Sequence, residues 1–175
     1  MINRRSFLKG SAAAGALMFL PSCQTSKVKN ANGKLNVAFV GVGGRGYNAV
    51  ESLEKHPDIV NLVAFCDVQD DTPLKPWSGY KSAMVTYKKH PDVKRFRDYR
   101  VMLDKMDREI DAVVVATPDH MHYPIAAWAI AKGKHVYCEK PLTRTIWEAH
   151  ELKRLAKEAG VITQMGNQGH TNEGW

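Results

Sequence analysis

Residues 35–46 read LNVAFVGVGGRG, an apolar run that leads directly into a glycine-rich segment. A continuous apolar run bounded by glycines is typical of a strand buried on both faces. The glycines have the spacing Gly-x-Gly-x-x-Gly, with Gly41, Gly43 and Gly46 at its three positions. The first permits a tight turn, the second lets the backbone approach a pyrophosphate, and the third allows close packing of helix on strand. The segment therefore predicts a strand, a phosphate-binding turn and a helix in succession.

Apolar runs and helical patterns alternate along the rest of the chain. The predicted strands cover residues 35–41, 59–67, 93–96, 110–118, 134–141 and 161–166. The predicted helices cover residues 47–56, 77–90, 98–106, 122–133 and 145–160, with Asp98 as an N-cap and Gly133 as a helix end. Strands alternating with helices imply right-handed crossovers. The fold class is therefore α/β, a Rossmann-type doubly wound parallel sheet with helices on both faces.

An acid closes the second predicted strand. Asp67 lies 21 residues after Gly46, where a carboxylate is placed to hydrogen-bond a ribose 2′-hydroxyl. A carboxylate there repels a 2′-phosphate, which favours NAD over NADP as the cofactor. The alternative is a methyltransferase, which can also combine a glycine-rich first loop with an acid after its second strand.

The fourth predicted strand ends in ATPDHMHYP. Ligands of open α/β sheets bind outside the carboxyl ends of the strands, so we expect the turn that opens the next helix to contact the cofactor. Its polar and turn residues are Thr117, Pro118, Asp119, His120 and His122. Two histidines alone do not make a metal site, and no third ligand follows at a fitting spacing, so no metal is predicted.

The fifth predicted strand ends in Glu139, Lys140 and Pro141. We expect this turn at the same edge of the sheet as the glycine loop, where a partly desolvated lysine beside an acid can polarise a substrate hydroxyl or help to deprotonate it. Lys140 is therefore the candidate catalytic residue. The alternative is an ordinary solvated turn.

The first 22 residues have the features of an export signal. Arg4 and Arg5 precede a short apolar run, and the pattern closely resembles a twin-arginine signal peptide, which exports proteins already folded. Residues 20–23 also resemble a lipoprotein processing box with Cys23 as the lipidated residue, ordinary cleavage nearby being the alternative. Residues 23–34 are polar and predict a flexible tether. We expect a periplasmic protein, anchored to the membrane only through this signal or a lipid.

The charge and the cysteine content argue against a nucleic-acid-binding protein, a cysteine metal site and a disulfide-rich fold. The net charge of +7 comes partly from the signal segment, and no basic run is interleaved with aromatic residues, so nucleic acid is not an expected partner. Cys66 and Cys138 end apolar strands and are predicted to be buried free thiols. Three cysteines without Cys-x-x-Cys spacing predict neither a metal site nor a disulfide framework.

Four segments together resemble the Gfo/Idh/MocA oxidoreductases: GVGGRG, DAVVVATPDHMH, GKHVYCEKPLT and MGNQGH. The resemblance runs from about Leu35 to the last residue. It implies that Glu139 and Lys140 border the nicotinamide and the sugar, with Lys140 assisting proton transfer, and that His170 could reach the substrate. The residues that it and the motifs assign to the cofactor are Gly41, Gly43, Gly44, Arg45, Gly46, Asp67, Thr117, Pro118, Asp119, His120, His122, Glu139, Lys140 and Asn167.

The resemblance also implies a C-terminal domain that supplies most sugar contacts. We expect residues 35–166 to form the NAD-binding domain and residues 167–175 to begin the second domain. This chain is then an N-terminal fragment, which we expect to bind the cofactor but not to catalyse turnover by itself. The expected activity of the whole protein is NAD-dependent oxidation of a sugar, cyclitol or glycoside hydroxyl. The alternatives are a glycosidase that retains NAD and a non-catalytic dinucleotide-binding module. Homo-oligomers occur in this family, and the twin-arginine export machinery is the expected protein partner.

Overall fold

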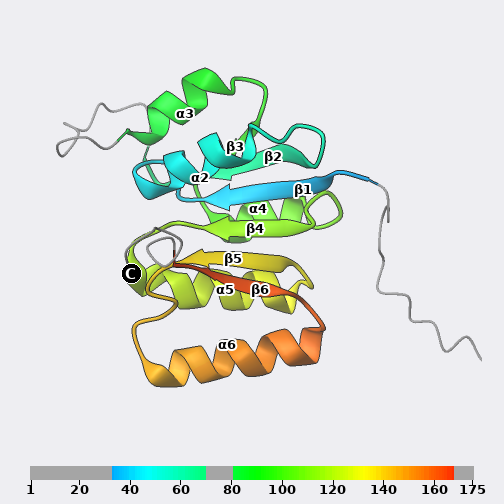
Figure 1. Cartoon of the computed structure of the whole chain (residues 1–175), viewed down its shortest axis with the longest axis vertical. Helices are drawn as coiled ribbons and strands as arrows, with labels where there is room; N and C mark the ends of the chain where they lie inside the picture. The colour runs from blue at the N-terminus through cyan, green and yellow to red at the C-terminus, as the bar shows by residue number, and fades with distance from the viewer. Residues whose placement is uncertain (1–32, 70–80, 168–175) are drawn as a thin grey trace, which may run out of the picture. The chain divides into compact units, whose positions relative to one another are not determined.

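Six parallel strands form a single sheet in the order β3-β2-β1-β4-β5-β6 (Figure 1). The structure is a computed structural model and describes residues 33–69 and 81–167. The strands are β1 (Leu35–Val40), β2 (Val60–Cys66), β3 (Lys94–Phe96), β4 (Ala112–Val115), β5 (His135–Glu139) and β6 (Thr163–Gly166). Strand order changes direction between β1 and β4, and such a switch point is where ligands of doubly wound sheets bind.

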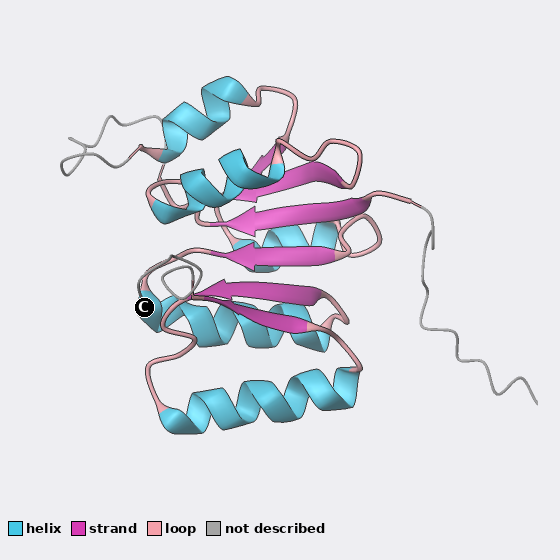
Figure 2. Ribbon diagram, viewed as in Figure 1, coloured by secondary structure: helices cyan, strands magenta, loops and turns pink. Residues whose placement is uncertain are grey.

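Helices connect the strands and lie on both faces of the sheet (Figure 2). They are α2 (Arg45–Leu53), α3 (Ala83–Lys89), α4 (Tyr99–Lys105), α5 (His122–Ala131) and α6 (Ile146–Ala159), with a short 3₁₀ turn η1 (Asp119–Met121) before α5. Helices α2 and α3 pack on one face, and α4, α5 and α6 pack on the other. This arrangement confirms the predicted Rossmann-type fold with its doubly wound parallel sheet.

Alternate residues of each strand serve two separate cores. On β1, Val37 and Phe39 point into the core under α2 and α3, where the Phe39 ring meets the Phe65 ring edge-on at a centroid distance of 5.9 Å. The intervening Ala38 and Val40 point into the larger core under α4, α5 and α6. Because side chains alternate between faces along a strand, an apolar run with no polar interruption is what a sheet covered on both sides requires.

Capping residues mark the ends of several helices. Asp98 caps α4 by accepting a hydrogen bond from the backbone N–H of Arg100 at 2.9 Å, as predicted. Thr145 and Glu148 form a capping box at the start of α6, and Gly160 ends that helix in the left-handed conformation. The helix predicted over residues 77–90 is α3, which begins at Ala83; residues 70–80 lie outside the described part of the chain.

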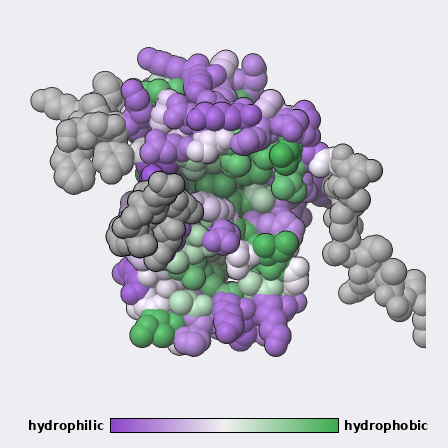
Figure 3. All heavy atoms as spheres, viewed as in Figure 1, coloured by the Kyte–Doolittle hydropathy of each residue, from purple (hydrophilic) through white to green (hydrophobic). Residues whose placement is uncertain are grey.

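One half of the sheet is open on the side of α2. Figure 2 shows no helix over β5 and β6 on that face within residues 33–69 and 81–167, and Figure 3 shows apolar side chains gathered across its middle. A groove of about 460 Å³ follows β1, β4, β5 and β6 there, with Arg45, Tyr137 and Gln164 among its lining residues. It brings side chains of α2 beside the end of β5.

Several predictions fall outside the described residues. These concern the signal over residues 1–22, Cys23 with residues 24–32 of the tether, and residues 168–175, which include His170. The chain divides into two units, residues 1–33 and 34–175, and all the helices and strands given above belong to the second. Within the described ranges, none of the helices is long and apolar enough to cross a membrane.

Candidate functional site

The glycine turn between β1 and α2 is in direct backbone contact with the end of β4. Gly41 has a φ of +84°, and a Cβ added there would lie 2.5 Å from the carbonyl oxygen of Ala116. A Cβ on Gly46 would lie 2.0 Å from the carbonyl oxygen of Gly41. Gly44 also has a positive φ, of +51°. The turn therefore has no room for side chains at the first and third motif positions, as the motif predicts for a loop that lets backbone approach a pyrophosphate.

Asp67 lies beside this turn at the end of β2. Its Oδ2 accepts a hydrogen bond from the backbone N–H of Val42 at 2.9 Å, and its Oδ1 accepts one from the N–H of Gln69 at 3.0 Å. The carboxylate is half-buried. The ends of β1 and β2 thus place an acid next to the glycine loop. In this arrangement a carboxylate can accept a hydrogen bond from a ribose hydroxyl.

Helix α3 supports the glycine turn in ways that the sequence did not reveal. The buried Thr86 hydroxyl donates a hydrogen bond to the carbonyl oxygen of Val42 at 2.6 Å. The N–H of Gly44 donates to the carbonyl oxygen of Lys81 at 2.7 Å, and Gln69 Oε1 accepts from the N–H of Ala83 at 2.9 Å. No motif spacing marks these residues, because their role depends on how α3 packs on the turn.

The turn after β4 leads away from the same edge of the sheet. Thr117 is half-buried, whereas Pro118, Asp119 and His120 are exposed. The Thr117 hydroxyl oxygen is buried, and among the described residues it has no hydrogen-bond partner. A buried hydroxyl without a partner is costly, so its position beside the glycine turn fits a site completed by a polar ligand. This orphaned atom and the tight glycine turn both fit a dinucleotide cofactor.

His122 differs from its neighbours because only 1% of its surface is exposed. Its Nδ1 lies 2.6 Å from the carbonyl oxygen of Pro141, and its Nε2 lies 2.8 Å from that of Thr117. Both ring nitrogens therefore face backbone carbonyls, which leaves neither of them directed at a cofactor.

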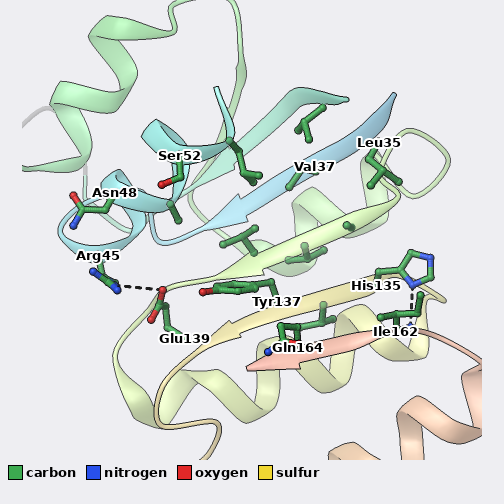
Figure 4. A pocket seen from close by; sticks show the side chains of 17 residues that line it. Leu35, Val37, Arg45, Asn48, Ser52, His135, Tyr137, Glu139, Ile162 and Gln164 are labelled. Carbon is green, nitrogen blue, oxygen red and sulfur yellow. Dashed lines mark hydrogen bonds and ion pairs between the residues drawn. The ribbon is translucent and has the colours of Figure 1, made fainter. Parts of the chain in front are cut away.

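The turn after β5 joins the glycine helix through an ion pair. Glu139 is 4% exposed, and its Oε1 lies 3.4 Å from Nε of Arg45, the first residue of α2 (Figure 4). Lys140 is exposed, and the peptide bond between it and Pro141 is cis. The exposure of Lys140 contradicts the partial desolvation that was expected for it, as far as the described residues go.

Asn167 follows β6, where it is exposed and its N–H donates to the carbonyl oxygen of Met165 at 3.1 Å. In a parallel sheet the carboxyl ends of the strands share one edge, so residues after β1, β2, β4, β5 and β6 all lie there. The structure thus brings the predicted cofactor residues to one edge of the sheet, except that the His122 ring is buried between two backbone carbonyls.

The two strand cysteines are buried free thiols, as predicted. Burial, with Asp67 and Asp98 nearby, raises the pKa of Cys66 to about 12. Burial, together with the charge of Glu139, raises the pKa of Cys138 to about 12. Neither thiol is a nucleophile at neutral pH. Across residues 33–69 and 81–167, no cluster of three or more His, Cys, Asp or Glu residues could hold a metal ion.

Comparison with known proteins gives the same assignment for most of the chain. Residues 35–167 match the Gfo/Idh/MocA family, described as an oxidoreductase family with an NAD-binding Rossmann fold. Residues 1–21 match the signal sequence of the twin-arginine translocation pathway, which supports export by that route.

Individual relatives differ in the activity that their names state. A glycosyl hydrolase family 109 protein of Shewanella amazonensis is 32% identical over 89% of this chain and 37% of its own length. The structure of GenD2 from gentamicin A biosynthesis, in complex with NAD, is 30% identical with a TM-score of 0.64, and the match covers 76% of this chain and 34% of that one. D-galactose-1-dehydrogenase of Rhizobium etli is 27% identical with a TM-score of 0.57, covering 74% and 36% of the two chains.

The chain spans little more than a third of the length of these relatives. The family match covers the glycine turn, the acid after β2 and the Glu-Lys-Pro turn after β5, which are the features that the geometry brings to one edge of the sheet. This chain belongs to the Gfo/Idh/MocA oxidoreductase family and contains its NAD-binding Rossmann domain.

Proposed function

We propose that the protein encoded by the complete gene is an NAD-dependent oxidoreductase that acts on a hydroxyl group of a sugar, cyclitol or glycoside. The observation that supports this most strongly is the contact between Arg45 and Glu139, 3.4 Å apart. It ties the turn that carries Lys140 to the helix that begins at the glycine loop. A candidate proton-transfer group is thereby kept beside a candidate dinucleotide site.

The cofactor would lie along the carboxyl edge of the sheet. Gly41, Gly43, Gly44, Arg45 and Gly46 would surround its pyrophosphate, where the N-terminus of α2 favours negative charge. Asp67 would receive a ribose hydroxyl, which favours NAD over NADP. The turn residues Thr117, Pro118, Asp119 and His120, with Glu139, Lys140 and Asn167, would border the nicotinamide half.

Lys140 would move a proton. A bound nicotinamide dinucleotide supplies the hydride acceptor. Oxidation of the alcohol to a carbonyl removes a hydride from the carbinol carbon and a proton from its hydroxyl, that is, two electrons and two hydrogen nuclei. The side chain of Lys140 would polarise that hydroxyl and help its proton to leave.

The lysine assignment is tested by Lys140→Ala in the protein encoded by the complete gene. Proton transfer by a positioned side chain raises the reaction rate by about 100-fold to 10,000-fold. In the variant, kcat should therefore fall by at least about 100-fold while the affinity for NAD changes little. Lys153→Ala, an exposed lysine in the middle of α6, is the matched control and should keep wild-type kcat. An equal small effect of both substitutions would contradict the assignment.

A glycoside hydrolase that retains NAD is the second candidate, because relatives named glycosyl hydrolase family 109 match about nine-tenths of this chain. Such an enzyme oxidises a ring hydroxyl, eliminates the leaving group and then reduces the product. With nitrophenyl glycosides as probes, this activity predicts nitrophenol release without accumulation of NADH. A dehydrogenase predicts one NADH for each sugar oxidised. NAD binding without either product would indicate a non-catalytic dinucleotide-binding module.

Export by the twin-arginine route would deliver the folded protein to the periplasm. Lipid attachment at Cys23 would then hold it at the membrane, and incorporation of labelled palmitate into wild-type protein but not into Cys23→Ala tests this. Homo-oligomer formation would be measured on the same material by light scattering.

A further inference from the structure

The buried His122 connects two turns that the proposed function uses. It is the first residue of α5, and its ring lies between the carbonyl oxygens of Thr117 and Pro141. Thr117 follows β4 and belongs to the candidate cofactor turn, whereas Pro141 directly follows Lys140. Thr117 and Pro141 are 24 residues apart in the sequence, and the His122 side chain contacts both.

A carbonyl oxygen only accepts hydrogen bonds, so the ring holds a turn through a nitrogen that carries a proton. Nδ1 lies 2.6 Å from the Pro141 carbonyl oxygen and Nε2 lies 2.8 Å from that of Thr117, both within hydrogen-bond distance. With only 1% of its surface exposed, the ring is packed between the two turns and sets the distance between them.

We propose that His122 is a positioning residue that fixes the backbone of the Lys140 turn against the turn after β4. This inference rests on the proposed function, since it gives the orientation of Lys140 a structural cause. His122 acts through Thr117 and Pro141 and does not touch the cofactor. It differs in this respect from Asp119 and His120, which are exposed on the same turn.

The test uses protein from the complete gene, with His122→Asn as the variant and His150→Asn, an exposed histidine of α6, as the matched control. Circular dichroism checks that His122→Asn, and His122→Gln as a second variant, fold as the wild type does. Hydrogen exchange followed by mass spectrometry reports the backbone of residues 138–145. Steady-state kinetics separate kcat from the KM for NAD.

In His122→Asn, exchange over residues 138–145 should rise at least tenfold and kcat should fall at least tenfold, with the KM for NAD within threefold and the control unchanged. Unchanged exchange or unchanged kcat in the folded variants would overturn the proposal. A wild type that binds no NAD would overturn the proposed function instead, while the exchange result would still decide the role of His122.

Discussion

The close approach of α2 to the glycine turn predicts a large penalty for Gly46→Ala. The new Cβ would lie 2.0 Å from the Gly41 carbonyl oxygen and 2.7 Å from its carbon. Both atoms are backbone and cannot move aside as the end of a flexible side chain can. The helix must therefore shift away from the turn, or the turn must open.

The size of the effect follows from two opposing contributions. Overpacking lowers the unfolding free energy by about 1–3 kcal/mol and sometimes more. Because this clash is with backbone atoms, we expect a cost near the upper value, about 3 kcal/mol. Replacing glycine by alanine within a helix returns about 1 kcal/mol. The unfolding free energy should therefore fall by about 2 kcal/mol, which lowers Tm by roughly 4–8 °C for a domain of this size.

Gly160→Ala is the control because it separates steric clash from backbone strain. Gly160 has a φ of +65°, and a Cβ added there meets nothing within 4 Å. A left-handed alanine costs roughly 1–2 kcal/mol, and the less flexible unfolded chain returns about 0.4–1 kcal/mol, so the net loss lies between about 0 and about 1.6 kcal/mol.

Urea unfolding and NAD titration calorimetry measure both effects. Gly46→Ala should be the less stable variant and should lose at least tenfold in NAD affinity, whereas Gly160→Ala should bind NAD as the wild type does. Equal stability and equal affinity in the two variants would refute the close packing of α2 on the turn.

Three further predictions follow from other contacts. Asp67→Ala should lower NAD affinity at least tenfold and reduce discrimination against NADP in titration calorimetry, because the carboxylate faces the turn through Val42; unchanged discrimination would contradict this. Thr145→Ala should lower the unfolding free energy by about 1 kcal/mol through loss of the α6 cap, with Thr145→Ser as a near-neutral control in urea unfolding. Cys66 and Cys138 should resist iodoacetamide in the native protein at pH 8 and react in urea. The pKa of both thiols in the folded protein, about 12, exceeds the ordinary value of 9.0. Their contribution to the free energy of unfolding is therefore fully present below pH 9 and is lost as pH rises towards 12, which unfolding measured across this pH range checks.

Local pattern was sufficient for the fold because β4 and most of β1, at the centre of the sheet, are uninterrupted apolar runs, and because each connection between strands contains a helix. The spacing of Gly41, Gly43 and Gly46 predicted the turn because that backbone geometry admits no other residue at two of the three positions. The carboxyl-edge location of Glu139 and Lys140 followed from the parallel direction of the strands. These inferences depend on neighbours in sequence or on sheet direction alone.

Contacts between elements could not be read in the same way. The hydroxyl of Thr86 reaches the Val42 carbonyl only because α3 packs over the turn. His122 was grouped with the exposed residues of its motif, but the first turn of α5 carries its ring inward between two carbonyls. The exposure of Lys140 likewise depends on what covers the end of β5, which a strand pattern does not encode.

The central claim is that this edge of the sheet binds NAD. The most direct measurement is titration calorimetry of the wild-type protein, expressed from its complete gene, with NAD and with NADP in parallel. The account predicts a one-to-one complex with NAD and an affinity for NADP at least tenfold weaker, because of Asp67. Absence of NAD binding, or tighter binding of NADP, would contradict it.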